Sequence, residues 1–203
     1  MVGAPYPTQL LANTLRAVSE EPYHEYWYKL GKFVHQFAQA EGRLLCLVRQ
    51  VAGIQDPISG LVLSGLRQEA ARDLLNRILD ATDQQQRKDR LQRPLEQLAT
   101  IATIRNNIIH WGAIHDGNPE LLVSNTALGP TPQRLKEFRI HPSDLDNMCE
   151  DLERINVLIM TENNPSFPDD GAWGKYMRRP WLYKPPQPSP PKPPQAAQSR
   201  KRR

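Results

Sequence analysis

The stretch YHEYWYKLGKFVHQFAQAEGRLLCLVRQV, residues 23–51, decides the fold. Its large apolar side chains recur every three or four residues, which is the spacing of one face of an α-helix. Gly53 and then Pro57 follow, and these residue types commonly mark the end of a helix and the loop beyond it. We therefore expect one long helix here, with Gly31 and Gly42 as the places where it could be interrupted. The apolar residues that define its buried face are Trp27, Leu30, Phe33, Val34, Phe37, Leu44, Leu45, Val48 and Val51.

Three further segments have the same helical period. The first covers residues 65–81, with apolar residues on one side and charged residues on the other. The second covers residues 83–112, where Pro94 is expected either to kink the helix or to start a new one. The third covers residues 144–160. Four amphipathic helices are therefore expected, or five if Pro94 divides the second segment.

The segment between the last two helices has a different composition. It is rich in Gly, Pro and Asn, and its short apolar pieces at residues 121–123 and 138–140 are expected to pair as a hairpin. Ser143 is predicted to be the N-cap of the last helix, with Asp146 at the capping-box distance. The predicted fold class is all-α, an antiparallel bundle of four to five helices with a small irregular or hairpin insertion.

Composition separates residues 163–203 from the rest of the chain. This segment holds 10 of the 19 prolines, and it carries nine Lys or Arg residues against two Asp residues. Residues 1–162 carry 17 basic and 20 acidic residues, so the basic overall charge belongs to the tail. We predict a disordered, proline-rich basic tail over 163–203, a helical bundle over 22–162 and a separate N-terminal segment over 1–21.

Two functions for the tail are open from its composition. A basic tail can bind RNA, DNA or another anionic surface through a salt-sensitive attraction, or it can simply keep the protein in solution. Its aromatic residues alternate with cations, as in proteins that bind single-stranded nucleic acid, but the same pattern fits a peptide that docks on a protein partner or on the bundle. The residues concerned are Trp173, Lys175, Tyr176, Arg178, Arg179, Trp181, Tyr183 and Lys184.

The cysteines and the hydropathy of the chain indicate in which cellular compartment the protein is expected. Cys46 and Cys149 lie within apolar helical patterns and lack the spacing of a metal site, so both are expected to pack in the core of a protein from a reducing compartment. The N-terminus does not resemble a signal peptide, and no apolar stretch reaches the length of a membrane span. We therefore expect a cytoplasmic protein without membrane contact.

The main chemical lead is IRNNIIHW, residues 104–111, where an arginine, two asparagines and a histidine interrupt an apolar helix. On an unbroken helix Arg105 and His110 would project roughly 140° apart and about 7.5 Å apart along the axis. Their side chains can meet one ligand only if the helix ends or distorts near His110, or if a second chain completes the site. Gly112 provides a helix end at a suitable position.

The motif R-x-x-x-x-H, formed by Arg105 and His110 with Asn106 directly after the arginine, resembles the signature of the HEPN superfamily of small helical bundles. The segments GKFVHQFAQAEGRLLCLVRQVAG and RIHPSDLDNMCEDLERI also resemble the long early helix and the closing helix of bacterial HEPN-like proteins of unassigned function. The resemblance covers residues 22–160, and leaves the tail unexplained.

The resemblance implies a metal-independent endoribonuclease in which two protomers bring their motifs together at a composite cleft. His110 would then act as general acid or base on the ribose 2′-hydroxyl or the leaving oxygen, and Arg105 would stabilise the charge on the phosphate. Asn106 would orient the arginine or the phosphate. No metal and no cofactor are expected, because RNA supplies its own nucleophile. The expected partners are RNA and a second copy of the chain.

The alternative is a non-catalytic interaction or nucleotide-binding module in which the motif is structural. In that case Arg105 would pair with a carboxylate of the long first helix, for which Glu41 is the candidate, and His110 would cap a helix end. Arg67 is expected either to reach the same cleft from a neighbouring helix or to remain a solvated surface residue.

Other polar or aromatic clusters have weaker support. His110, His115 and Asp116 lack the spacing of metal ligands on a helix. His35 and Gln36 could join Glu41 in a buried polar network. Four aromatic residues surround His24, where packing at a helix start is expected rather than base stacking. These aromatic residues are Tyr23, Tyr26, Trp27 and Tyr28.

Overall fold

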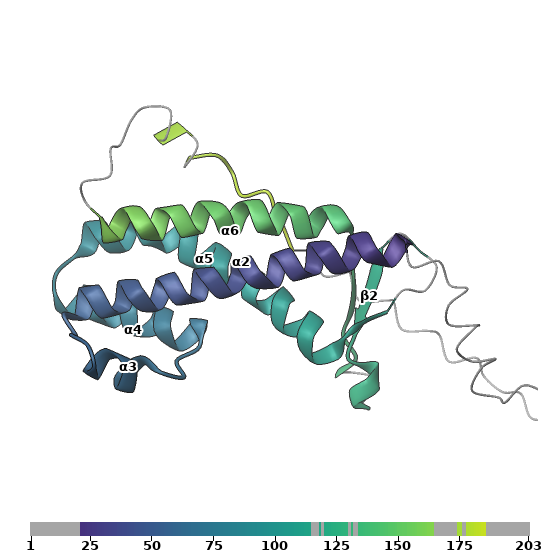
Figure 1. Ribbon diagram of the computed structural model, residues 1–203, viewed down its shortest axis with the longest axis horizontal. Coiled ribbons are helices and arrows are strands. Elements are labelled where there is room, and N and C mark those ends of the chain that lie inside the picture. Colours follow the sequence, from purple (N-terminus) through teal and green to yellow (C-terminus); the bar gives the residue numbers. More distant parts are fainter. Residues whose placement is uncertain are drawn as a thin grey trace, which may run out of the picture.

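The computed structural model describes residues 21–114, 118, 120–129, 131, 134–164, 174–175 and 178–185. Within these residues the chain forms five α-helices and a small antiparallel sheet, which confirms the predicted fold class. None of the described helices is both long and apolar enough to cross a membrane. In chain order the elements are α2 (Glu21–Ala52), α3 (Ile58–Leu63), α4 (Gln68–Ala81), α5 (Gln85–Trp111), β1 (Ala113–Ile114), β2 (Leu121–Ser124), the 3-10 helix η1 (Thr126–Leu128), β3 (Glu137–Ile140) and α6 (Pro142–Asn163) (Figure 1).

The two long helices α2 and α6 lie side by side and run in the same direction. Polar contacts join them at intervals of seven residues on both helices, which is the spacing expected for helices packed at a shallow angle. Helix α5 runs in the opposite direction to both (Figure 1). Helix α5 is therefore antiparallel to α2 and α6, and these two helices are parallel to each other. The contacts are Lys29 to Asp146 (2.8 Å), Gln36 to Glu153 (2.7 Å) and Arg43 to Met160.

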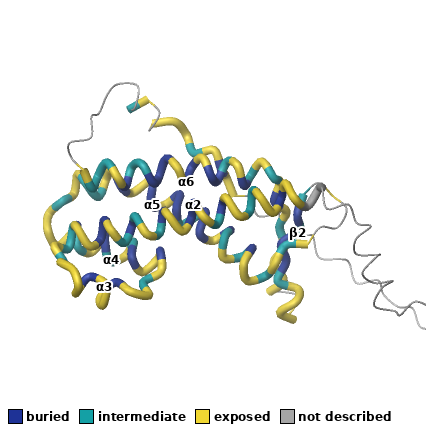
Figure 2. Tube along the Cα trace, in the orientation of Figure 1, coloured by how far each residue is buried: buried dark blue, intermediate teal, exposed yellow. Residues whose placement is uncertain are grey.

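The buried core lies where α2, α4, α5 and α6 meet (Figure 2). Helix α2 continues through Gly31 and Gly42, since both positions face open space and the chain on either side is held by core residues. Helix α5 continues through Pro94, which is buried, so the proline does not start a new helix. The fully buried side chains of α2 include Phe33, Phe37, Leu44, Leu47 and Val48.

The predicted hairpin is confirmed and is one strand larger than expected. Strands β2 and β3 pair antiparallel, with Leu121 opposite Ile140 and Val123 opposite Phe138. Strand β1 adds to the other side of β2 directly after the end of α5. Leu121, Val123 and Ile140 are buried, so one face of the sheet extends the core of the bundle.

Two local predictions are corrected at helix starts. The short helix α3 was not expected, because its six residues are too few to show a helical period; Leu63 is buried, whereas Ile58, Leu61 and Val62 are exposed. The N-cap of α6 is His141 and not Ser143. The Nδ1 atom of His141 accepts from the backbone N–H of Ser143 at 3.2 Å, and Asp144 accepts from the backbone N–H of His141 at 2.9 Å. Pro142 explains the shift, because proline fits the first helical position, where no N–H is needed.

Two residues expected in the core lie at the surface. Trp27 is 59% exposed and contacts the buried Tyr26 ring edge-on. Cys46 is also exposed, whereas Cys149 is buried as predicted. Trp27 lies at the border of the α2 face that packs against α6 and α4, so a helical period alone does not separate it from the core positions. Cys46 lies on the opposite, exposed side of α2 together with Gln39, Gly42 and Gln50, where the helical period itself excludes it from the core.

The C-terminal segment, residues 178–185, packs against α5 and α6, which is the docking onto the bundle that the sequence left open. The buried carboxylate of Asp151 accepts the backbone N–H groups of Leu182 at 3.0 Å and Tyr183 at 2.9 Å. Gln97 on α5 donates both to Asp151, at 2.8 Å, and to the carbonyl oxygen of Tyr183, at 3.0 Å. These bonds fix the segment to the bundle, and the Tyr183 side chain joins the core.

Arg154 holds the start of the C-terminal segment. Its guanidinium donates to the carbonyl oxygens of Arg179 at 2.7 Å and Pro180 at 3.1 Å. The same guanidinium lies 4.1 Å from the centre of the Trp181 ring, which is a cation–π contact. Of the other tail aromatics named above, Trp173 and Tyr176 lie outside the described residues.

Candidate functional site

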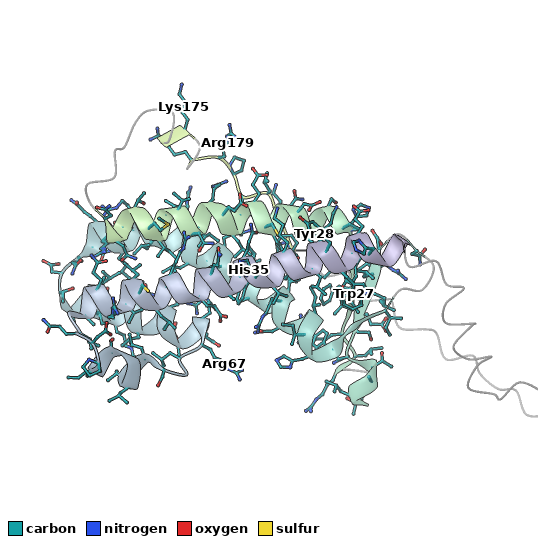
Figure 3. All side chains as sticks on the ribbon, viewed as in Figure 1. Trp27, Tyr28, His35, Arg67, Lys175 and Arg179 are labelled. Atoms are coloured by element: carbon teal, nitrogen blue, oxygen red, sulfur yellow. The ribbon has the colours of Figure 1, made fainter. Side chains whose placement is uncertain are left out.

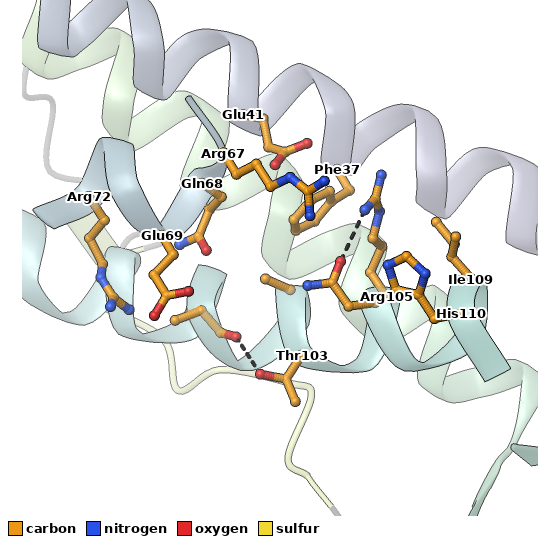
Figure 4. A pocket seen from close by; sticks show the side chains of 13 residues that line it. Phe37, Glu41, Arg67, Gln68, Glu69, Arg72, Thr103, Arg105, Ile109 and His110 are labelled. Atoms are coloured by element: carbon orange, nitrogen blue, oxygen red, sulfur yellow. Dashed lines mark hydrogen bonds between the residues drawn. The ribbon is translucent and has the colours of Figure 1, made fainter. Parts of the chain in front are cut away.

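A cavity of about 550 Å³ opens between α2, α4 and α5. All five residues predicted from the sequence to form the site line this cavity (Figure 4). Glu41 comes from α2, Arg67 directly precedes α4, and the remaining three come from the last turns of α5. Those three are Arg105, Asn106 and His110.

Arg105 is held by two contacts. Its guanidinium lies 5.3 Å from the centre of the Phe37 ring, and its Nη1 atom donates to the Oδ1 atom of Asn106 at 3.0 Å. The Nε atom of Arg105 is buried and has no hydrogen-bond partner among the described residues. Arg105 is therefore oriented by Asn106, and its Nε–H group remains able to donate a hydrogen bond to a ligand oxygen.

His110 is exposed at the end of α5. The helix ends one residue later at Trp111, and Gly112 has a φ of 76°, a backbone conformation that strongly favours glycine. One condition named from the sequence, a helix end near His110, is thus met, and both Arg105 and His110 line the same cavity. Within the described part of the chain His110 makes no hydrogen bond, so its imidazole remains accessible to a ligand.

Glu41 and Arg67 lie on the opposite wall of the cavity from His110. Figure 4 shows the Arg67 side chain extending into the cavity beneath Glu41. Arg67 therefore reaches the cleft, which is one of the two positions expected for it from the sequence. Among the described residues no ion pair joins Glu41 to Arg105, so the pair on which the structural reading of the motif depended is not formed.

Several other residues of the same cavity were not predicted from the sequence. Gln68, Glu69 and Arg72 lie in the first turns of α4, and their place opposite α5 depends on how the two helices pack. Thr103 was detectable, because it lies three residues before Asn106 and seven before His110 on the same face of α5.

Gln68 supplies an independent indication of a ligand. Its side chain is only 7% exposed, and its Nε2 atom is buried without a hydrogen-bond partner among the described residues. A buried donor without an acceptor costs about 1–3 kcal/mol. Gln68 and Arg105 therefore give one cavity two buried N–H donors without acceptors. Three arginines outnumber two carboxylates on its walls, so an anionic ligand with several oxygens fits the site best.

The other candidates do not extend this site. Gln36 donates to Glu153 at 2.7 Å and His35 bonds Gln39 at 3.0 Å, so neither joins Glu41. Trp27 and Tyr28 lie exposed on α2 (Figure 3).

Among the described residues no group of three or more His, Cys, Asp and Glu side chains is placed to hold a metal ion. His115 and Asp116 lie outside the described residues, so the grouping of these two with His110 has no structural description.

The fold and the cavity define a helical bundle with a cation-lined polar site at the end of α5. Comparison with models of protein families, with curated proteins and with solved structures found no match for the chain. The resemblance to the HEPN superfamily therefore depends on the motif and the two helical segments quoted above.

Proposed function

We propose that this protein is a metal-independent endoribonuclease of the HEPN type that acts as a homodimer. The observation that supports the proposal is the common cavity of Arg105, Asn106 and His110, with two buried N–H donors that lack acceptors. A phosphodiester supplies the acceptor oxygens that such donors need, and RNA adds a 2′-hydroxyl as an internal nucleophile.

The chemistry needs one proton acceptor, one proton donor and a cation. The 2′-oxygen of the ribose attacks phosphorus, and the bond from phosphorus to the 5′-oxygen breaks, which leaves a 2′,3′-cyclic phosphate and a free 5′-hydroxyl. His110 exchanges one of the two protons, since imidazole is suited to both roles near neutral pH. Arg105 stabilises the negative charge that grows on the phosphate oxygens in the transition state.

A homodimer would complete the proton transfers, because the partner's motif would supply the second imidazole. Ile109 supports this part of the proposal. It lines the cavity directly before His110 and is 47% exposed, and Ile114, just beyond the helix end, is 58% exposed. A partner protomer that packed on this end of α5 would bury these two apolar side chains.

The test is cleavage of RNA in EDTA by the wild-type protein and by His110→Ala. His35→Ala is the matched control, because His35 is an exposed histidine that does not line the cavity. We expect cleavage by the wild type and by His35→Ala, and none by His110→Ala. Intact RNA with the wild type, or equal cleavage by His110→Ala, would contradict the proposal.

A second candidate function is a non-catalytic module that binds a nucleotide in the same cavity. Glu41 and Glu69 favour it, because carboxylates on the cavity wall repel a polyanion but can accept hydrogen bonds from a base. In the same assay this function predicts binding of a mononucleotide, weakened by Arg105→Gln, together with intact RNA.

A further inference from the structure

A second hollow, of about 960 Å³, lies between α5, α6 and the C-terminal segment and shares no lining residue with the cavity above. We call it the basic groove. Its walls carry six cationic side chains and a single carboxylate, Glu96. The cations come from all three elements, so the charge is a property of the packed structure and not of the tail alone. They are Arg90, Arg93, Arg154, Arg178, Arg179 and Lys184.

The groove is a built structure because its outer wall is fixed to the bundle. The C-terminal segment is held by the hydrogen bonds of Asp151, Gln97 and Arg154, all of which are buried. Arg178 and Lys184 lie at its two ends and are exposed. The buried hydrogen bonds of Asp151 hold the C-terminal segment in place, and this fixes the positions of the exposed cations that the segment carries. In a free tail these positions would vary.

Several of the cations are available to a ligand. Arg90 is already neutralised by Glu162, to which it donates at 2.6 and 3.0 Å. Among the described residues, in contrast, no ion pair joins Arg93, Arg178 or Lys184 to a carboxylate. These three occupy both walls of the groove and are exposed.

The geometry points to a chain-like polyanion: we propose that the basic groove binds single-stranded nucleic acid through its phosphates, with Arg93, Arg178 and Lys184 as contact residues. Arginine predominates in the groove, and its planar fork matches phosphate oxygens better than an ammonium does. Trp181 contributes an aromatic ring to the wall. The shape is concave with cations on two sides, which suits an extended strand better than a flat membrane surface.

The sequence beyond the groove continues the same charge. Residues 186–203 contain five Lys or Arg residues and no acidic residue, and they follow directly after Lys184 and Pro185 at one end of the groove. The chain beyond the groove thus adds cations and no side-chain carboxylate to the sequence that follows it. This inference does not depend on cleavage, because it concerns binding at residues outside the His110 cavity.

The experiment measures binding with the full-length His110→Ala protein, so that the probe stays intact whether or not the wild type cleaves RNA. The probes are labelled single-stranded uridine and deoxythymidine oligonucleotides of about 20 nucleotides, longer than the ~4 to 16 nucleotides that a typical single-strand site covers. Affinity is measured by fluorescence anisotropy over a series of salt concentrations. The groove variant carries three further substitutions in the His110→Ala protein, namely Arg93→Gln, Arg178→Gln and Lys184→Gln.

We expect the triple substitution to reduce the slope of log affinity against log salt by about 2, because each phosphate contact on a single strand contributes about 0.7. The matched control makes the same change in net charge at exposed cations outside the groove. Circular dichroism and the urea midpoint should match the parent for both variants, because every substituted side chain is exposed. The control substitutions are Lys32→Gln, Arg77→Gln and Lys136→Gln.

Binding of either oligonucleotide that the groove substitutions weaken more than the control substitutions supports the proposal, and the relative affinities show whether the ribose contributes. Absence of binding to both oligonucleotides would overturn it. Equal losses in the groove variant and the control would overturn it, since net charge alone would then explain binding. Tighter binding to polyglutamate or to vesicles of anionic lipid than to both oligonucleotides would also overturn it.

Discussion

At the scale of single residues, Asp151 is the group on which the C-terminal segment depends most. Its carboxylate is fully buried and accepts three N–H groups, from Gln97, Leu182 and Tyr183. Hydrogen bonds to a charged group are stronger than those between neutral groups, and each buried donor that loses its acceptor is costly. Asp151 thus fixes Leu182 and Tyr183 to the bundle, and Arg154 fixes the start of the same segment.

We predict that Asp151→Ala lowers the free energy of unfolding by about 2–4 kcal/mol, because it leaves buried N–H donors without an acceptor. Asp146→Ala is the control. Asp146 lies on the same helix and is half exposed in its ion pair with Lys29, so its loss should cost less than about 1 kcal/mol. Urea denaturation measures both values, and equal effects of the two substitutions would show that the Asp151 network contributes little.

Alkaline pH should destabilise the fold through three buried groups. Burial raises the pKa of Tyr26 and Tyr183 from 10.0 to about 12 and that of Cys149 from 9.0 to about 11. Because the folded state favours the protonated forms, their contribution is complete below pH 9 and is lost as the pH rises towards 12. The urea midpoint should fall over this range and fall less steeply in Tyr183→Phe, which cannot ionise at that position. A midpoint independent of pH would contradict the prediction.

At the scale of elements, helical period predicted α2, α4, α5 and α6 because each has a continuous buried face. The same signal was absent from α3, where Leu61 is 80% exposed, with Ile58 and Val62 also exposed. The helical period of a sequence also does not predict in which direction a helix runs relative to its neighbours. The parallel course of α2 and α6 follows from contacts such as Lys29 with Asp146, which join residues more than a hundred positions apart.

The two glycines inside α2 lead to a prediction about this element. A Cβ atom at Gly31 or Gly42 would have no heavy atom within 4 Å apart from its immediate surroundings, and both positions are helical. Alanine should therefore raise the free energy of unfolding by about 0.5–1 kcal/mol at each position.

Gly112→Ala is the contrasting variant, because its φ of 76° strains any residue with a Cβ. It should lower the free energy of unfolding. Stabilisation by all three substitutions, measured in urea, would mean that the end of α5 does not constrain Gly112.

At the scale of the whole molecule, the residues of α5 that line the site could be predicted from the sequence, whereas the residues brought to them by packing and the order of the C-terminal segment could not. Arg105 and His110 were predictable because one helix carries them and Gly112 ends that helix. Gln68 was not, since its position beside them depends on the packing of α4. The order of the C-terminal segment was also not predictable, because Tyr183 is held by Asp151, 32 residues earlier in the chain.

Two polar surfaces on different faces of α5 follow from this packing. The His110 cavity faces α2 and α4, and the basic groove faces α6 and the C-terminal segment. We infer a division of roles in which the groove binds a strand and the cavity acts on one of its phosphates. Residues 1–162 have an acidic net charge, and six of their 17 basic residues line these two places.

The most direct test of the central claim compares two oligonucleotides of the same sequence, one of RNA and one with every ribose 2′-O-methylated, in excess chelator. If the RNA supplies its own nucleophile and His110 transfers the proton, the wild-type protein should cleave only the RNA and leave 2′,3′-cyclic phosphate ends. Cleavage of the methylated strand, or RNA that stays intact with the purified protein, would contradict the claim.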